Sequence, residues 1–236
     1  MRPTAIVLRQ RVSDSDYTNQ AIRTLYETGT VRDIDGNTYQ TIRSGDQWWM
    51  AENLRVSKYR DGTPILFATD SADNEVMRND MYWIYNNNES GEMDTYGALY
   101  NWYAVVDSRN VAPEGWHVPE ASEWQVLVDN LGGEVVAGSY MKQTGTILWE
   151  DNAGATNQSG FTALPGGIYE HSGSWGDEPS CRGLGYSAYF WSATAVEDSI
   201  YGGAWCCRLY SRSSEVSRDG HSEWGGLSVR CVKDSP

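Results

Sequence analysis

The segments FWSAT (190–194) and GLSVRCV (226–232) enclose the last third of this chain. The stretch between them mixes Tyr, Ser, Arg, Gly, Asp, Cys and His, and no apolar period of a helix or a simple strand runs through it. Such residues are typical of recognition loops, because they supply contact area and hydrogen bonds at low entropic cost. The sequence therefore predicts a binding surface that is held at both ends by a fixed frame.

The composition favours one large domain with loops and amphipathic surfaces. The 236 residues include 11 Trp and 15 Tyr against 3 Phe, together with 24 Gly. The net charge of −14 argues against nucleic acid and anionic membranes as partners. No apolar run is long enough to span a bilayer, so we predict no membrane insertion. The apolar stretch 5–8 is too short for a signal peptide, so either a signal was trimmed or none is needed.

The sequence contains no pattern of a metal or catalytic site. The four cysteines form no CxxC pair, which argues against zinc, and we expect mostly free thiols: Cys181, Cys206, Cys207 and Cys231. Asp33, Asp35 and Asn37 resemble a calcium loop without its closing Glu, so we interpret them as a turn. For His117 we predict a buried ring with a backbone partner rather than a general base. We expect no metal, no cofactor and no catalytic residue.

The first part of the chain divides into an extension and a β-rich start. We interpret residues 1–30 as an N-terminal extension for attachment or oligomerisation, with a short helix predicted at 14–27. A domain of residues 31–236 follows. A hairpin turn signal at 35–36 precedes a strand predicted at 39–43, and a second turn at 44–46 separates it from a strand predicted at 47–51.

Two helices are predicted in the middle of the chain. The first lies within 96–106, where Leu99, Trp102, Tyr103 and Val106 recur at helical spacing. The second follows Pro119 and ends at Gly132-Gly133, with an apolar stripe at Trp124, Leu127, Val128 and Leu131. Short strands with long connections fit the Gly-rich remainder, so the fold class is α+β. The core is expected to hold most of the tryptophans: Trp48, Trp49, Trp102, Trp116, Trp124 and Trp191.

Taken in order, these segments resemble the Fibrobacter succinogenes major paralogous domain over residues 31–234. The segments that carry the resemblance are DIDGNTY (33–39), QWWMAENL (47–54), GALYNW (97–102), GWHVP (115–119), LPGG (164–167), WSAT (191–194) and SVRCVKD (228–234). The resemblance implies a C-type lectin-like fold with two helices, short twisted antiparallel sheets and long loops. Several members of the family are variable proteins of diversity-generating retroelements, in which adenine miscopying scatters template Asn codons.

That resemblance implies a variable, ligand-binding region at about residues 195–226. An Asn codon changed only at its adenines can give Tyr, Ser, Asp, His, Arg, Gly, Cys, Ile or Val, but not Trp, Glu, Lys, Gln or Met. By this test the fixed template includes Trp205, Glu215, Glu223 and Trp224. We expect Arg208, Leu209 and Val216 to brace the framework, the last two facing inward. The candidate ligand-binding residues are Asp198, Tyr201, Trp205, Tyr210, Ser211, Arg212, Ser214, Arg218, Asp219, His221 and Trp224. An ordinary polar sheet surface is the alternative.

The family resemblance also implies a disulfide that this chain lacks. Family members commonly carry a cysteine just before the PxGWH motif, which pairs with the equivalent of Cys231, and here that position is Ala112. A missing bridge of this kind typically forfeits about 2–4 kcal/mol. The chain must recover this in its core or fold in a reducing compartment.

The sequence thus predicts a receptor-binding protein that is not an enzyme. Its partner would be a protein or glycan receptor on a target cell, and it would act outside the cell, on a phage tail or a bacterial surface, with trimerisation through residues 1–30 as one option. Two alternatives remain open. One is a non-diversified structural or carbohydrate-binding adhesin module. The other is an enzyme related to formylglycine-generating enzymes, in which Cys206 and Cys207 would be the reactive pair.

Overall fold

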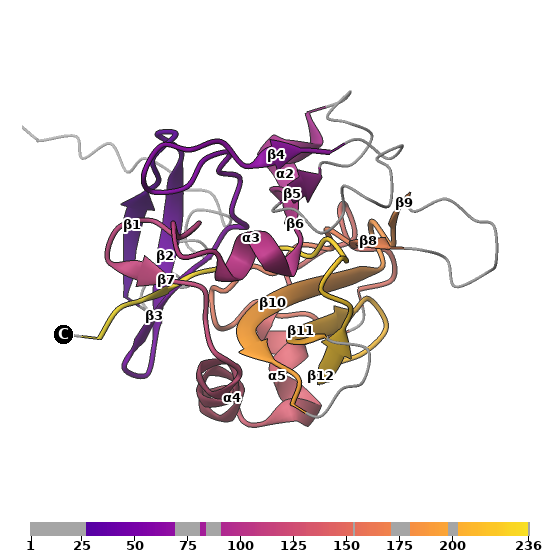
Figure 1. Ribbon diagram of the computed structural model, residues 1–236. Coiled ribbons are helices and arrows are strands. Elements are labelled where there is room, and N and C mark those ends of the chain that lie inside the picture. The colour runs from indigo at the N-terminus through magenta and orange to yellow at the C-terminus, as the bar shows by residue number, and fades with distance from the viewer. Residues whose placement is uncertain are drawn as a thin grey trace, which may run out of the picture.

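A five-stranded antiparallel sheet brings the two ends of the domain together. The computed structural model describes residues 27–68, 81–83, 91–152, 154–170, 180–197 and 203–235. The sheet has the order β1-β2-β3-β13-β7, so the last strand lies between two strands from early in the chain (Figure 1). Its strands are β1 (Thr28–Arg32), β2 (Thr38–Ser44), β3 (Gln47–Met50), β7 (Trp116–His117) and β13 (Val232–Lys233).

The predicted early strands and turns are confirmed. Strands β2 and β3 form a hairpin around the 44–46 turn, and β1 pairs with β2 from Thr28 onward, so residues 28–30 of the predicted extension belong to the sheet. The rest of the extension, including nearly all of the helix predicted at 14–27, lies outside the described residues. The Asp33 carboxylate accepts hydrogen bonds from the backbone and side chain of Asn37 and from Tyr39 Oη, and so closes a turn.

The second predicted helix is confirmed as α4 (Ala121–Asn130). Its first turn is closed by a reciprocal capping box between Glu120 and Glu123. Trp124, Leu127 and Val128 are buried as the apolar stripe predicted. Gly132 and Gly133 follow with φ of 94° and 91°, a backbone region that favours glycine and ends the helix.

The first predicted helix is largely wrong. Residues 96–106 form the end of α2 (Glu92–Tyr96), then strand β6 (Leu99–Tyr100), and only then the short helix α3 (Trp102–Val106). Gly97 breaks the chain direction at φ 75°, and the Asn101 side chain caps α3 by accepting from Ala104 N. Leu99 and Tyr100 instead pair with β5 and with Leu227, so tertiary pairing overrides the helical spacing.

The described residues contain two helices that the sequence analysis did not predict, α2 and α5, and three sheets besides the five-stranded one. Helix α5 (Glu134–Met141) was missed by the sequence analysis, because its small and apolar residues are spread around the helix and give a weak periodic signal. The mixed α+β class is confirmed. The remaining strands are β4 (Leu66–Phe67), β5 (Met81–Trp83), β8 (Ile168–Glu170), β9 (Ser180–Arg182), β10 (Ser187–Ala195), β11 (Ala204–Tyr210) and β12 (Val216–His221).

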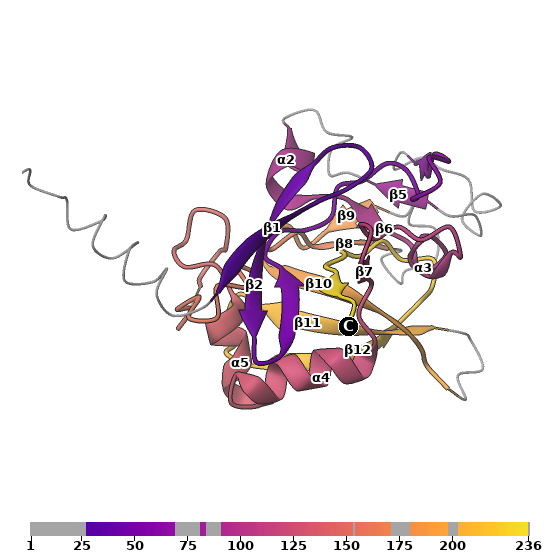
Figure 2. The ribbon, with the colours of Figure 1, turned by 90° about the vertical axis from the view of Figure 1, so that its left-hand side faces the viewer.

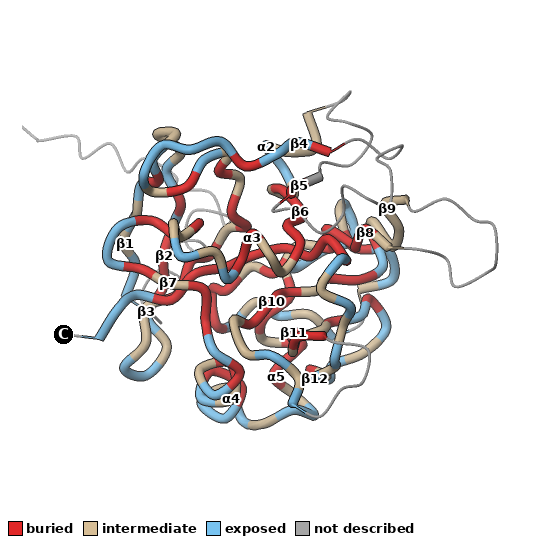
Figure 3. The backbone as a smooth tube through the Cα atoms, in the orientation of Figure 1, coloured by how far each residue is buried: buried red, intermediate tan, exposed pale blue. Residues whose placement is uncertain are grey.

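The sheet β10-β11-β12 lies between two clusters of buried side chains. Trp191 packs into a cluster with Tyr100 and Val229, while the preceding Phe190 packs into a second cluster with Trp124 and Leu209. Consecutive strand residues point to opposite faces, so one strand serves both clusters. Figure 3 shows most of β10 buried, as its burial pattern records.

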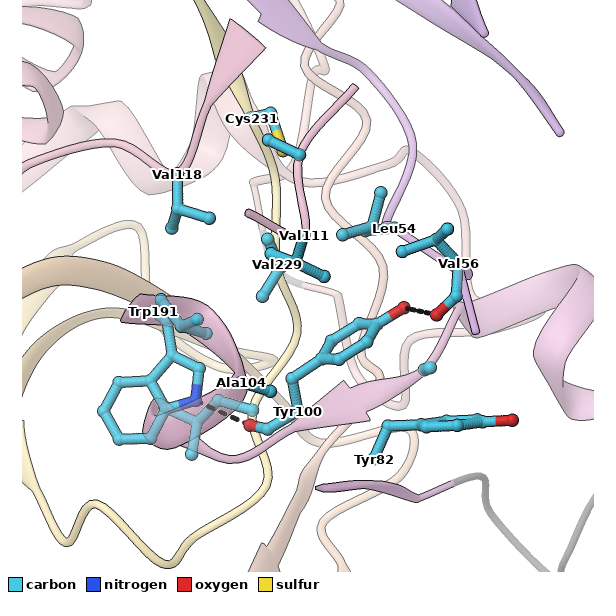
Figure 4. Close-up of a cluster of buried hydrophobic side chains, with 14 of the residues drawn as sticks. Leu54, Val56, Tyr82, Tyr100, Ala104, Val111, Val118, Trp191, Val229 and Cys231 are labelled. Atoms are coloured by element: carbon cyan, nitrogen blue, oxygen red, sulfur yellow. Dashed lines mark hydrogen bonds between the residues drawn. The ribbon is translucent and has the colours of Figure 1, made fainter. Parts of the chain in front are cut away.

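Hydrogen bonds join the first cluster to the central strands. Trp191 Nε1 donates to Tyr100 O at 2.7 Å, and Tyr100 Oη donates to Val56 O at 2.7 Å (Figure 4). Buried indole and phenol groups need such partners, and these bonds link β10 to β6 and β6 to the segment around Val56. Of the tryptophans predicted to lie in the core, Trp48 and Trp102 are only partly buried. The other four are buried.

His117 joins helix α4 to the C-terminal segment, but its ring is 35% exposed rather than buried, and its partners are carboxylates rather than the predicted backbone group. Its Nδ1 lies 2.6 Å from Asp234 Oδ1 and its Nε2 lies 3.0 Å from Glu123 Oε2. Burial lowers the pKa of His117, but the hydrogen bonds to Asp234 and Glu123 more than offset this and raise it above its usual value.

The raised pKa of His117 predicts a pH-dependent stabilisation. A folded-state pKa above the unfolded value of about 6.5 gives stability that is fully present below that value and lost as the pH rises through the folded pKa. We expect the melting temperature of the wild type to exceed that of His117→Gln by more at pH 6 than at pH 9. An equal difference at both pH values would contradict a charged bridge.

Candidate functional site

The β11–β12 hairpin places the residues of the predicted variable region on two opposite faces. The register pairs Cys206 with Asp219 and Ala204 with His221, so these side chains share one face. Leu209 and Val216 point the other way and are 0% and 6% exposed, which confirms that both face inward. Each face of the hairpin contains both buried and exposed side chains, so the predicted contact residues do not form one exposed surface.

One face carries a connected group of polar and aromatic side chains, which we call the tyrosine face: Tyr189, Arg208, Tyr210, Asp219 and His221. The hydroxyls of Tyr189 and Tyr210 lie 3.0 Å apart. The Arg208 guanidinium stacks over the Tyr210 ring at 4.7 Å and forms an ion pair with Asp219 at 2.8 Å. Burial, together with the Tyr210 bond, raises the pKa of Tyr189, so its phenol stays protonated.

His221 closes the group at its inner edge. Its ring packs edge-on against Tyr189 and Trp191, with centroid distances of 6.2 and 5.8 Å. Its Nε2 lies 3.3 Å from Glu170 Oε2, a side chain from β8. These contacts bury most of the His221 side chain, which is 15% exposed, while Tyr210 remains exposed.

A second set of contacts holds the end of the hairpin against helix α3. Glu223 accepts hydrogen bonds from Tyr103 Oη at 3.2 Å and from Gly203 N at 3.3 Å. Trp224 Nε1 donates to Tyr103 Oη at 2.8 Å, and the indole stays 39% exposed. Tyr103 thus ties two of the residues assigned to the fixed template to the body of the domain.

The loop between β11 and β12 is docked on helix α5. The buried Lys142 ammonium donates to the carbonyls of Tyr210, Ser211 and Ser213 at 2.9–3.0 Å. A Cβ atom added to Gly138 would lie 2.6 Å from backbone oxygens in the loop, so only glycine permits this approach. The loop backbone is therefore fixed by the domain.

The other predicted contact residues lie away from the tyrosine face. Ser211 is buried at 5% exposure, and Arg212 pairs with Asp151 at 2.9 Å beyond the end of the strands. Ser214 is exposed on the docked loop, where its carbonyl accepts from Ser139 N. Trp205 and Arg218 lie on the opposite face of the hairpin, next to helix α4. Asp198 and Tyr201 lie outside the described residues.

Sequence reasoning missed part of the tyrosine face. Arg208, which we expected to brace the framework, is 28% exposed and lies at the centre of the face. Tyr189 and Glu170 come from strands that precede the predicted region. Tyr189 was detectable in principle, because it lies two residues before Trp191 and so on the same side of a strand. Nothing in the sequence indicated Glu170.

The four cysteines are all described, and their thiols are separated in the fold. Burial raises the pKa of Cys206 to about 12 and raises that of Cys207 as well. The two thiols pack into different core clusters, because neighbouring strand residues point apart, and none of the four cysteines forms a disulfide. Among the described residues, no three His, Cys, Asp or Glu side chains come together where they could hold a metal ion. None of the described helices has the length and apolar character needed to cross a membrane.

Comparison with family models identifies the family of most of the described chain. The model of the Fibrobacter succinogenes major domain matches residues 42–233, which covers the five-stranded sheet from the end of β2 onward and the complete β10–β12 sheet. The chain belongs to this family. No curated protein and no solved structure matched the chain.

Within the Fibrobacter succinogenes major domain family, this chain has Ala112 where a disulfide partner for Cys231 is expected. Ala112 and Cys231 are 1% and 0% exposed and lie in the same core cluster (Figure 4 shows Cys231). Apolar packing therefore fills the position where the family resemblance implies a bridge.

Proposed function

We propose that this domain binds a ligand through the tyrosine face, that residues 195–226 are diversified by a retroelement, and that the fold is C-type lectin-like. The receptor would be a protein or glycan on a target cell, met from a phage tail or a bacterial surface. The observation that carries the proposal is the convergence of Tyr210, Asp219 and His221 on one face. All three are products that adenine changes in an Asn codon can give.

The arrangement of the face supports binding. Tyrosine supplies large contact area with few rotatable bonds, and the stacked Arg208 is already oriented by Tyr210 and Asp219. Side chains fixed before binding lose little further entropy when a ligand docks. Aromatic and arginine side chains are also the residues that most often dominate binding energy.

The framework contacts support the division into fixed and variable positions. Glu223 and Trp224, which adenine changes in an Asn codon cannot produce, are bonded to Tyr103 of α3. Leu209 and Val216 are buried in the core. Variation at Tyr210, Asp219 or His221 would alter the face without removing these contacts.

We do not propose the enzyme alternative, since the geometry gives it no support. A reactive cysteine pair needs thiols that are near each other, accessible and readily ionised. Cys206 and Cys207 are buried, and their side chains lie on opposite sides of the strand. A non-diversified adhesin of the same family remains the main competitor, and the sequences of sibling genes distinguish the two.

The test of diversification is a comparison of this gene among sibling isolates. We expect replacements to concentrate at positions 208, 210, 219 and 221, and to spare Leu209, Val216, Glu223 and Trp224. A near-copy of the 3′ coding end beside a reverse transcriptase gene should accompany them. Replacements spread evenly over residues 31–236 would support the non-diversified adhesin instead.

Binding through the tyrosine face predicts a strong effect of Tyr210→Ala. Truncation of a central aromatic contact typically costs about 1–3 kcal/mol, or roughly 5- to 150-fold in affinity. The measurement is adsorption of the labelled protein to a panel of bacterial cells. Tyr186→Ala is the matched control, because Tyr186 is a 49% exposed tyrosine that lies outside this face. Equal losses for the two variants would argue against the tyrosine face as the binding site.

A further inference from the structure

An open hollow of about 410 Å³ lies where the turn of the β2–β3 hairpin comes beside helices α4 and α5 (Figure 2). We call it the amide hollow. Its lining includes Arg43, Asn130, Leu131, Tyr140, Gln158 and Ser159. The volume lies within the range of small-ligand sites in proteins. No lining residue belongs to the tyrosine face, so this is a separate site.

Contacts between distant segments hold the walls of the amide hollow together. A Cβ atom added to Gly45 would lie 2.5 Å from Asn130 Nδ2, so the end of α4 packs closely on the hairpin turn. On the other side, Ser159 donates from its backbone N and its Oγ to Tyr140 O, at 3.1 and 2.7 Å. The loop that follows α5 is thereby tied to that helix, and the hollow is a product of the tertiary fold.

Three neutral side chains place hydrogen-bonding groups around the amide hollow. Within the part of the chain that the structure describes, the amides of Asn130 and Gln158 and the hydroxyl of Tyr140 form no hydrogen bond. Each carboxamide carries two N–H donors and an acceptor oxygen, and the phenol both donates and accepts. Leu131 and the Tyr140 ring add apolar area next to these groups. The hollow therefore combines several free donors and acceptors with a small apolar patch.

The charges at the amide hollow do not select an ionic ligand. Among the described residues that line it, Arg43 alone is charged, and its guanidinium pairs with Glu27 at 3.3 Å and with Asp46 at 3.5 Å. A neutral ligand with many hydroxyls suits the remaining groups, because each hydroxyl donates and accepts, as a carboxamide does. A peptide presents its donors and acceptors along a line, whereas these groups come from separate segments around one hollow.

We propose that the amide hollow binds a neutral sugar unit. Its hydroxyls bond to the amides of Asn130 and Gln158 and to the phenol of Tyr140, and the C–H face of its ring lies against Leu131. The proposal goes beyond the tyrosine face and does not rest on diversification, because the two sites share no residue.

The experiment titrates the full chain with the methyl glycosides of glucose, galactose, mannose and N-acetylglucosamine. The signals are the side-chain NH₂ resonances of Asn130 and Gln158 in NMR spectra, assigned with Asn130→Ser and Gln158→Ala. We expect at least one glycoside to shift both signals saturably, and acetyl-Ala-Ala-amide to shift neither. The disaccharide of the best-binding sugar distinguishes two supporting outcomes: tighter binding assigns the site to a sugar chain, and weaker binding assigns it to a free monosaccharide.

The variants distinguish recognition from a structural role. Tyr140→Phe and Gln158→Ala should each weaken binding of that sugar about three- to tenfold, because each removes hydrogen bonds between neutral groups. Their melting temperatures should match that of the wild type, which separates lost binding from lost folding. Gln40→Ala is the matched control and should change nothing, since Gln40 is an exposed glutamine of β2 outside the hollow.

Three results would overturn the proposal: no saturable shift with any of the four glycosides, an equal shift with the peptide, or an unchanged affinity in both variants. Tyr210→Ala should leave sugar binding at the amide hollow intact. Failure of this proposal is therefore separable from failure of the tyrosine face.

Discussion

Replacing Arg230 with Met should lower the free energy of unfolding by about 3–5 kcal/mol, the largest effect that we expect from a single substitution. Arg230 is 0% exposed, and its guanidinium donates to four acceptors: Asn53 Oδ1, Met50 O, Phe161 O and Thr162 O. Burial lowers its pKa to about 9, which reflects the cost of placing the charge in the core. Methionine fills the space but leaves the acceptors without donors.

The size of this effect depends on what remains after the substitution. An apolar replacement of a buried ion can be nearly neutral when its partners are replaced as well. Here three of the partners are backbone carbonyls, which no side-chain change removes. Each buried acceptor left without a donor costs about 1–3 kcal/mol. The guanidinium also stacks on the Phe161 ring at 4.3 Å, and that contact is weakened too.

Urea denaturation measures the effect, with Arg43→Met as the matched control. Arg43 lies in an exposed ion pair with Glu27, so its loss should cost at most about 1 kcal/mol. Arg230→Lys should fall between the two, because an ammonium keeps the charge but cannot reach all four acceptors. A loss below about 1 kcal/mol in Arg230→Met would show that the core does not depend on these bonds.

Replacing Lys142 with Met should destabilise the protein by about 2–4 kcal/mol and loosen the loop beneath the tyrosine face. The ammonium is the common donor for three carbonyls of residues 210–213, and burial lowers its pKa. The Met side chain supplies no donor, so the loop backbone must turn toward water. Helix α5 would then hold the loop mainly by the close approach at Gly138.

Two measurements separate the local effect of Lys142 from the global one. Thermal denaturation gives the overall loss, and amide hydrogen exchange should accelerate more in residues 211–215 than in β2. Lys58→Met is the control, since Lys58 pairs with Asp35 at the surface and its loss should leave the melting temperature nearly unchanged. Uniform acceleration across both regions would mean that Lys142 supports the whole fold rather than the loop.

The contrast between the two predicted helices shows how far local pattern reaches. Helix α4 has a capping box, an apolar stripe and a glycine stop, all of which lie within its own segment. The 96–106 segment has a similar apolar spacing, but Leu99 and Tyr100 find strand partners in β5 and in the distant Leu227. Long-range pairing of this kind leaves no trace in a window of neighbouring residues.

The candidate surface shows the same limit. Residues 195–226 were identified as a recognition segment from composition and family resemblance, and Leu209 and Val216 were placed inside from alternation alone. Which residues share a face depends on strand register, which separates Trp205 and Arg218 from Tyr210, Asp219 and His221. The contribution of Tyr189 from β10 and Glu170 from β8 depends on sheet topology.

By itself, the sequence determined the family and the α+β class. It also determined the turns that join β1, β2 and β3, helix α4, and the segment proposed to carry the candidate surface. These follow from local turn chemistry, capping, periodicity and ordered motifs, which are properties of short stretches. Only the tertiary structure decided that Arg230 and Lys142 are buried donors and that the hairpin presents two different surfaces. Those features depend on contacts between residues far apart in the chain, whose free energy appears only when the sheets and helices pack together.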